Sequence, residues 1–203
     1  MAGTESGRRH TRDDVARAAL RILDDDGLPD LTMRRLAASL DVQPSALYWH
    51  FPNKQTLLAE LADRIVAQAA PRRAGADAGS HTRAAAFALR DALLAYRDGA
   101  EVVSSTLALG LGAASAREGL ADAIAADGFA RTDADRAATA LLHFVMGHVS
   151  HEQQRLQYDS LGVVAPEAGG AGLGASGSAD DFAFGVDLLI GGLQAARARV
   201  SEG

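Results

Sequence analysis

Cysteine is absent from the 203 residues of this chain, which excludes a disulfide scaffold, a cysteine-ligated zinc site and a thiol nucleophile. Aromatic residues make up only 5%, and no stretch shows the sustained alternation of a half-buried strand. No apolar run approaches the roughly 20 residues that a transmembrane helix needs, and the N-terminal segment lacks the apolar region of a signal peptide. We therefore expect a soluble, cytoplasmic protein with no membrane partner.

Lysine is also scarce, since Lys54 is the single lysine among 20 basic residues. The net charge is −6, but residues 1–73 hold 11 basic and 10 acidic side chains, whereas residues 74–203 hold nine basic and 16 acidic ones. The acidic excess thus lies wholly in the second part. An acidic chain binds nucleic acid when its basic groups gather on one face, so the total charge does not exclude a nucleic-acid partner.

Helical signals predominate in the first 70 residues. Thr11 is suited to cap a helix that ends at Gly27, because the apolar residues between them recur with the spacing of one helix face. Thr32 is suited to cap a short second helix, and Pro44 is suited to open a third. A fourth helix is predicted over about 53–70, where a proline stops it.

Helical patterns continue after an expected linker at 71–81. The further helices are predicted over 82–97, within 101–127, over 133–156 and over 180–199. The helix at 133–156 is apolar around much of its circumference, which is typical of a helix buried on several faces. Six glycines predict a flexible loop at about 159–179. The fold is therefore expected to be all-α.

One specific signal lies between Thr32 and Phe51. Two short amphipathic helices separated by a break of three or four residues make a helix-turn-helix. The second of them carries polar and aromatic groups near its ends, and such a helix can enter a major groove, where amides and hydroxyls pair with base edges. The spacing alone leaves an ordinary helical hairpin with a solvated polar face as an equal alternative.

The residues themselves favour the first interpretation. The segment LTMRRLAASLDVQPSALYWHFPNKQTLLAEL (31–61) resembles the helix-turn-helix signature of the tetracycline-repressor (TetR) family of bacterial transcription regulators. Three later segments, Tyr96–Ala100, His143–Gly147 and Phe184–Ile190, are similar to the ligand-binding and dimerisation domain of the tetracycline repressors. The resemblance covers almost the whole chain and is weaker over 107–131 and 157–179.

This resemblance implies an all-α homodimer in which an N-terminal three-helix head with a helix-turn-helix binds DNA and is joined to a larger helical body for ligand binding and dimerisation. Residues 1–70, including the linking fourth helix, would form the DNA-binding domain, and residues 71–203 the second domain. The implied function is that of a ligand-responsive transcriptional repressor, which binds double-stranded operator DNA as a homodimer and is released by a small-molecule effector. No enzyme activity and no cofactor are expected.

The resemblance also assigns DNA-binding positions. Arg34, from the second helix, and the start of the recognition helix would read bases, and the remaining positions would contact the DNA backbone. The full set is Arg34, Gln43, Pro44, Ser45, Ala46, Tyr48, His50 and Lys54. Because the base-reading residues differ from those of the tetracycline repressors, we expect a different operator sequence.

The ligand site departs further from the tetracycline repressors. Val103 stands where they have a magnesium-binding histidine, Ala70 aligns with a drug-contacting histidine, and a magnesium-linked glutamate falls near His151, beside Glu152. A hard cation needs oxygen or imidazole ligands, so we expect a retained pocket, no bound metal and a mostly apolar effector. The candidate ligand-binding residues are Phe87, Leu94, Val103, Thr106, Leu107, His143, Met146 and His151.

Other interpretations remain open at this point. His143, His148 and His151 lie close in sequence, and they are candidates for a metal site or for core histidines bonded to the backbone. Ser104 and Ser105 with these histidines are a weak candidate for a hydrolytic site, since no nucleophile elbow or phosphate loop accompanies them. A structural DNA-binding or protein-binding module without a ligand is a third possibility.

Dimerisation is expected through the helices at 133–156 and 180–199, which together would form a four-helix bundle with those of a partner. Val186 and Ile190 are predicted to face the partner. Gly185, Gly191 and Gly192 lower helix propensity, which is understandable if they allow a partner helix to approach closely.

Overall fold

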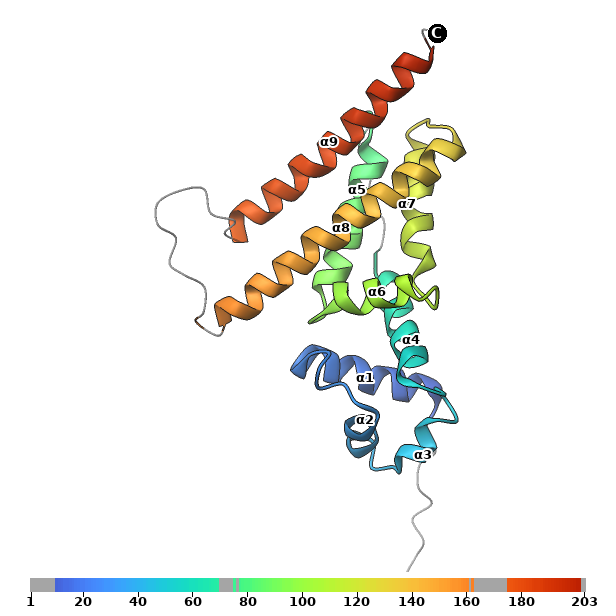
Figure 1. The fold of residues 1–203 in the computed structure, drawn as a ribbon, viewed down its shortest axis with the longest axis vertical. Helices are drawn as coiled ribbons and strands as arrows, with labels where there is room; N and C mark the ends of the chain where they lie inside the picture. The colour runs from blue at the N-terminus through green and yellow to red at the C-terminus, as the bar shows by residue number, and fades with distance from the viewer. Residues whose placement is uncertain (1–9, 70–74, 76, 161, 163–174, 202–203) are drawn as a thin grey trace, which may run out of the picture.

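The structure is a computed structural model that describes residues 10–69, 75, 77–160, 162 and 175–201. All regular elements in these residues are helices (Figure 1), so the expected all-α fold is confirmed. Their bounds are α1 Arg12–Asp26, α2 Met33–Ser39, α3 Pro44–Leu47, α4 Lys54–Val66, α5 Ser80–Leu94, α6 Gly99–Ala108, α7 Ala114–Ala126, α8 Arg131–Ser160 and α9 Ala175–Ser201.

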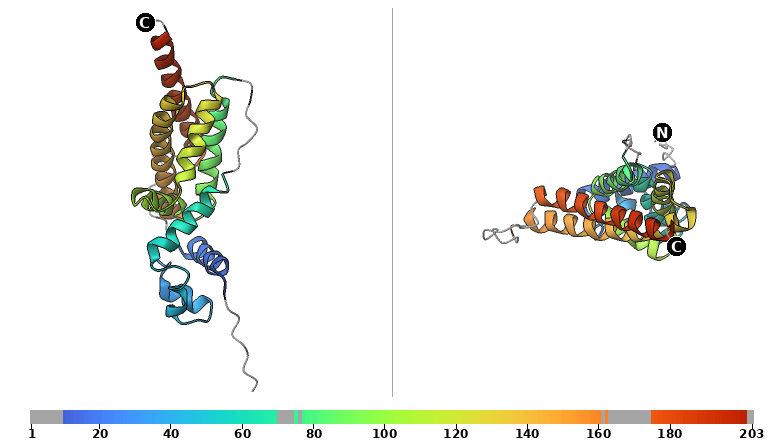
Figure 2. Two further views of the ribbon diagram at one scale, coloured as in Figure 1. Left: turned by 90° about the vertical axis from the view of Figure 1, so that its right-hand side faces the viewer. Right: turned by 90° about the horizontal axis from the view of Figure 1, so that it is seen from above.

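Helices α1–α3, which we call the head, lie together at one end of the molecule (Figure 1). Helices α5–α9, which we call the body, make up the rest, and α4 runs from the head into the body (Figure 2). Helices α8 and α9 are the longest and lie side by side along one face of the body. Within the described part of the chain, no helix combines the length and apolar composition of a membrane span.

The expected helix starts in the head are confirmed. Thr11 and Asp14 form a capping box at α1, Thr32 accepts a hydrogen bond from the Arg35 amide, and Pro44 occupies the first turn of α3. Such caps satisfy amides that a helix start leaves without an intrahelical partner. Gly27 follows the last residue of α1, as predicted, with a positive φ of 91°.

Several boundaries differ from the prediction. Helix α4 ends at Val66 instead of near residue 70, since the amides of Gln68 and Ala69 turn back to carbonyls three residues earlier. Helix α9 begins at Ala175, so the end of the expected glycine-rich loop is helical. Most of that loop (161 and 163–174), part of the expected linker (71–74 and 76) and Ala70 lie outside the described residues.

Hydrogen bonds to one carboxylate attach the start of α5 to the end of α7. Asp127, which follows α7, accepts hydrogen bonds from the amide and hydroxyl of Thr82 at 2.9 and 2.6 Å and from the amide and Nδ1 of His81 at 3.2 and 2.9 Å. Burial alone would raise the pKa of Asp127, but these hydrogen bonds outweigh burial and lower it. The ionised carboxylate thus holds the first turn of α5 against the end of α7.

We predict that Asp127→Asn destabilises the fold by about 1–3 kcal/mol at neutral pH, because buried donors lose an acceptor. A lowered pKa contributes stability above the ordinary Asp value near 3.9, and that contribution disappears as the pH falls below it. The melting temperatures of wild type and variant should therefore converge as the pH falls through the lowered pKa of Asp127. Asp180→Asn, at an exposed position of α9, is the control. A difference between wild type and Asp127→Asn that stays constant with pH would contradict this assignment.

Candidate functional site

The recognition segment (residues 43–50) is anchored from beneath and open on its outer side. Leu47 is buried against the head core, and Leu36 of α2 lies in the same core. Gln43, Ser45 and Ala46 are exposed, and the Gln43 side chain makes no capping bond at the start of α3. The structure therefore brings these predicted base-reading groups to one solvent-facing surface.

The most exposed aromatic side chain of this segment is one that the sequence reasoning missed. Trp49 is 89% exposed, and Tyr48 beside it is 48% exposed. Tryptophan is usually buried over most of its surface, so an exposed one indicates a contact surface. The position of the chain's single tryptophan inside the helix-turn-helix was a signal available in the sequence.

Arg12 of α1 fixes the end of the recognition segment. Its Nη1 donates to the His50 carbonyl at 2.9 Å, and its guanidinium lies 4.3 Å from the centroid of the buried Phe51 ring. His50 itself is half-buried. The segment is thus positioned from a neighbouring helix, which limits its freedom before any DNA is bound.

Two adjacent arginines of α2 differ sharply in environment. Arg35 forms ion pairs with Asp26 at 2.5 Å and Asp30 at 2.7 Å. Arg34 is exposed and forms no ion pair or hydrogen bond with the described residues, and the same holds for the half-buried Lys54. Arg34 and Lys54, which the resemblance assigns to DNA, are therefore available to a ligand, whereas Arg35 stabilises the head.

Helix α4 is fastened to the head by a charged network. Glu60 accepts from Arg12 at 2.9 Å and from Arg64 at 2.8 Å, and Arg64 also pairs with Asp13 at 2.7 Å. Burial raises the pKa of Glu60, but the hydrogen bonds from Arg12 and Arg64 outweigh burial and lower it. Because each of these pairs is partly exposed, a single pair contributes little to stability, and the stabilisation comes from the network that the pairs form.

The body packs against the other side of α4. Asp63 accepts a hydrogen bond from the Ala113 amide at 2.6 Å, and Ala113 has a positive φ of 60° in the turn between α6 and α7. A Cβ on Gly112 would lie 2.9 Å from the Ala59 carbonyl oxygen. This turn therefore packs directly on the backbone of α4, and only glycine fits at its point of closest approach.

Asp98 forms a second bridge between head and body. It precedes α6 with a positive φ of 56° and is buried. One carboxylate oxygen accepts from the Leu28 amide of the head at 2.8 Å, and the other accepts from Gln157 of α8. The turn between α1 and α2 is thereby tied to the long helix at the body surface.

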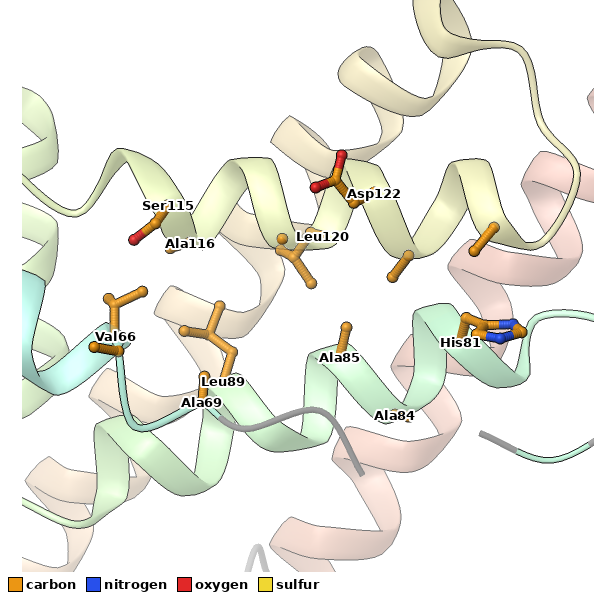
Figure 3. A pocket seen from close by; sticks show the side chains of 14 residues that line it. Val66, Ala69, His81, Ala84, Ala85, Leu89, Ser115, Ala116, Leu120 and Asp122 are labelled. Carbon is orange, nitrogen blue, oxygen red and sulfur yellow. The ribbon is translucent and has the colours of Figure 1, made fainter. Parts of the chain in front are cut away.

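A cavity of about 600 Å³ lies between the end of α4, α5 and α7 (Figure 3). Val66 and Leu89 lie at one end, whereas His81 lies at the other. The lining is mainly small and apolar, and it comprises Val66, Ala67, Ala69, His81, Ala84, Ala85, Leu89, Ser115, Ala116, Gly119, Leu120, Asp122, Ala123 and Ala126.

None of the eight predicted ligand-binding residues lines this cavity. Val103 and Thr106 are buried in α6, where the Thr106 hydroxyl donates to carbonyls of its own helix. Phe87 packs edge-to-face on Phe182 of α9 with ring centroids 5.1 Å apart. Of the others, Met146 is buried, Leu94 and Leu107 are half-buried, and His143 and His151 are exposed.

The three candidate histidines are not brought together. His148 contacts Phe182, with ring centroids 5.2 Å apart, whereas His143 and His151 are exposed on α8. Glu152 pairs with Arg90 of α5 at 2.6 Å. Among the described residues, no group of three or more His, Asp or Glu side chains is arranged to hold a metal ion.

An apolar stripe of α9 remains exposed in the single chain. Phe184 and Leu188 are 66% and 61% exposed. Val186 and Ile190, which were predicted to face a partner, are buried inside this chain, so that assignment is wrong. It failed because α8 covers one face of α9, and periodicity does not show which apolar face a neighbouring helix of the same chain occupies.

Three glycines of α9 also differ in whether a helix of the same chain covers them. A Cβ on Gly185 would lie 2.3 Å from the Phe144 ring of the same chain, whereas Gly191 and Gly192 have open space around the Cβ position. The close approach at Gly185 is therefore made by α8 within the chain. Gly191 and Gly192 are available to a partner helix.

An exposed helix-turn-helix on a head tied to a helical body defines a DNA-binding regulator of transcription. Comparison with known families agrees: residues 15–61 match the family of bacterial regulatory proteins called tetR, and residues 72–163 match the tetracyclin repressor-like C-terminal domain. The chain belongs to the TetR family, whose members are helix-turn-helix transcription regulators and not enzymes.

Three relatives show how far the similarity extends. The class C tetracycline repressor of Escherichia coli is 37% identical over 94% of both chains. A structure of BioQ with its double-stranded DNA operator is 40% identical, covers 91% of this chain and 98% of its own, and superposes with a TM-score of 0.74. A TetR variant from Acinetobacter baumannii in complex with minocycline is 33% identical over 93% and 98% of the chains, with a TM-score of 0.70.

Proposed function

We propose that this chain acts in the cytoplasm as a homodimeric repressor that binds a palindromic operator and is released by a mostly apolar effector. Residues 1–70 serve as the DNA-binding domain, and residues 71–203 hold the effector and the partner. The observation that carries the proposal is the placement of α4. This helix forms ion pairs with the head and a hydrogen bond with the body, and its last residue lines the cavity.

DNA binding is assigned to the exposed surface of α2 and the recognition segment. Arg34, Gln43 and Ser45 supply donors and acceptors for base edges, and Pro44 and Ala46 supply apolar contacts. Tyr48, His50 and Lys54 contact phosphates, which fix register. To this predicted set we add Trp49, whose exposed ring suits apolar contact with the DNA. The BioQ structure with its operator supports this assignment.

Effector binding is assigned to the cavity, because a ligand there touches Val66, Ala67 and Ala69 at the end of α4. Ligand cavities are mostly apolar with few polar anchors, and this one fits that description. The minocycline complex of a relative shows that a TetR protein of this fold accepts a ligand. A ligand that favours a different position of α4 moves the recognition segment through the network of Glu60 and Arg12.

Dimerisation is assigned to the exposed faces of α8 and α9. In such a dimer the two recognition segments must lie about 34–36 Å apart to enter successive major grooves. The exposed Phe184 and Leu188 supply apolar anchors, and the open Gly191 and Gly192 allow close helix packing. The effector then acts by changing the separation of the two heads.

We expect Arg34→Ala to weaken operator binding by roughly 1–3 kcal/mol with a melting temperature close to wild type, and to relax preference at particular base pairs. Arg35→Ala is the matched control, because it removes ion pairs inside the head and should lower stability by up to about 1 kcal/mol. Lys54→Ala should weaken binding to all duplexes by the same factor. Mobility shifts on selected and scrambled duplexes measure both effects. Equal losses for Arg34→Ala on the two duplexes would show that it reads no base.

Phe184→Glu combined with Leu188→Glu should yield a folded monomer, with dimerisation weakened by about a thousandfold or more if each anchor contributes ~2 kcal/mol or more. Val186→Glu should instead unfold the chain, because its charge would be buried in the protomer core. Sedimentation and circular dichroism separate the outcomes. A double variant that remains dimeric would place the interface elsewhere.

Asp98→Ala should expose the Leu28 amide to faster hydrogen exchange and weaken operator binding by about 1–3 kcal/mol, because a buried donor loses its acceptor. The slope of affinity against salt concentration should stay as in wild type, since no phosphate contact is removed. Lys54→Ala, which removes a proposed phosphate contact, should lower that slope. A salt slope that drops for Asp98→Ala would refute a positioning role.

A further inference from the structure

The walls of the cavity between α4, α5 and α7 favour aliphatic ligands. None of the 14 described lining residues is Phe, Tyr or Trp, and half of them are alanine. A planar ring system gains from stacking on aromatic side chains, and among the described lining residues only His81, at one end, supplies such a ring. A flexible or bulky aliphatic molecule needs no aromatic partner, because the free energy gained on its burial depends on the apolar area that is covered.

The cavity is elongated, and its two ends differ in chemistry. Along α5 it extends from His81 to Leu89, which is about 12 Å at the rise of an α-helix. Val66 and Leu89 lie at one end together with the hydroxyl of Ser115, and the imidazole of His81 lies at the other end (Figure 3). An occupant therefore has a long apolar part and a polar end at His81.

His81 presents an acceptor at that polar end. Its Nδ1 lies 2.9 Å from Oδ1 of Asp127. An ionised carboxylate only accepts hydrogen bonds, so Nδ1 carries the proton, and in the neutral form of the ring Nε2 is an acceptor. The hydrogen bonds to Asp127 lower its pKa, which keeps that carboxylate ionised.

The charges near this end are unfavourable to an anion. Asp127 is buried beside His81. The acidic residue of the lining, Asp122, is 70% exposed and is paired with Arg131 at 2.6 Å. Because none of the described lining residues is an arginine or lysine, a ligand carboxylate at His81 would lie near the charge of Asp127 without a cation from this lining.

We infer that the effector is an elongated aliphatic molecule whose polar end is a hydrogen-bond donor without negative charge, a hydroxyl or an ammonium group, held by Nε2 of His81. This inference rests on the proposed effector role of the cavity. It concerns which chemistry the cavity binds, and that chemistry is measurable without DNA.

Calorimetry with decanol, decylammonium and decanoate, each below its aggregation concentration, tests the inference on the full chain. Decanol and decylammonium should bind, and decanoate should bind about three- to tenfold more weakly, the range expected from one net hydrogen bond. Ala85→Leu, which points its added side chain into the cavity (Figure 3), should weaken all three. Ala114→Leu, exposed on α7 and outside the lining, should weaken none.

His81→Phe keeps a ring at this position and removes the acceptor, so it should reduce the preference for the donor-ended ligands to less than about twofold. Its melting curve shows whether the fold is kept, since Asp127 retains its bonds to Thr82 and to the amide of residue 81. Decanoate binding as tightly as decanol, binding unchanged by Ala85→Leu, or no binding of any probe would each overturn the inference.

The effector role is tested separately by a mobility shift with the same probes. If decanol binds as described and leaves the operator complex intact, the ligand chemistry stands and the proposed release mechanism fails. If decanoate alone releases DNA, the release mechanism stands and the inferred ligand chemistry fails.

Discussion

The attachment of α4 to both neighbours is the constraint on which the rest of the structure depends. On one side Glu60 and Arg64 bind α1 through Arg12 and Asp13, and on the other Asp63 holds the turn between α6 and α7. The same Arg12 holds the end of the recognition segment. The contacts that connect α4 in the body with the DNA-facing surface are therefore few and direct.

The body meets α4 at two places with different chemistry. Near the head, the contact is tight and specific, since Gly112 leaves no room for a side chain against Ala59. At its far end, α4 borders a cavity lined by small residues. In the proposed function, a ligand in this cavity changes the balance between two positions of α4.

Much of the fold could be predicted from the sequence, because the signals that define it are local. Thr11, Thr32 and Pro44 mark helix starts by their own chemistry, and the exposed Arg34 and Gln43 follow from the motif. The cavity could not be predicted, since it depends on which alanine faces of α5 and α7 oppose each other. The interface residues were misassigned for a related reason: Val186 and Phe184 are both apolar residues of one helix, and only the packing of α8 shows which is buried.

The emission of Trp49, the single tryptophan, tests most directly whether the body controls this surface. The account predicts that a selected operator duplex changes the emission until one duplex is bound per two chains, and that a ligand of the cavity reverses the change as it releases the DNA. Emission that stays constant while a mobility shift shows full binding would contradict the placement of Trp49 at the DNA. Reversal that persists in Ala85→Leu would contradict control through the cavity.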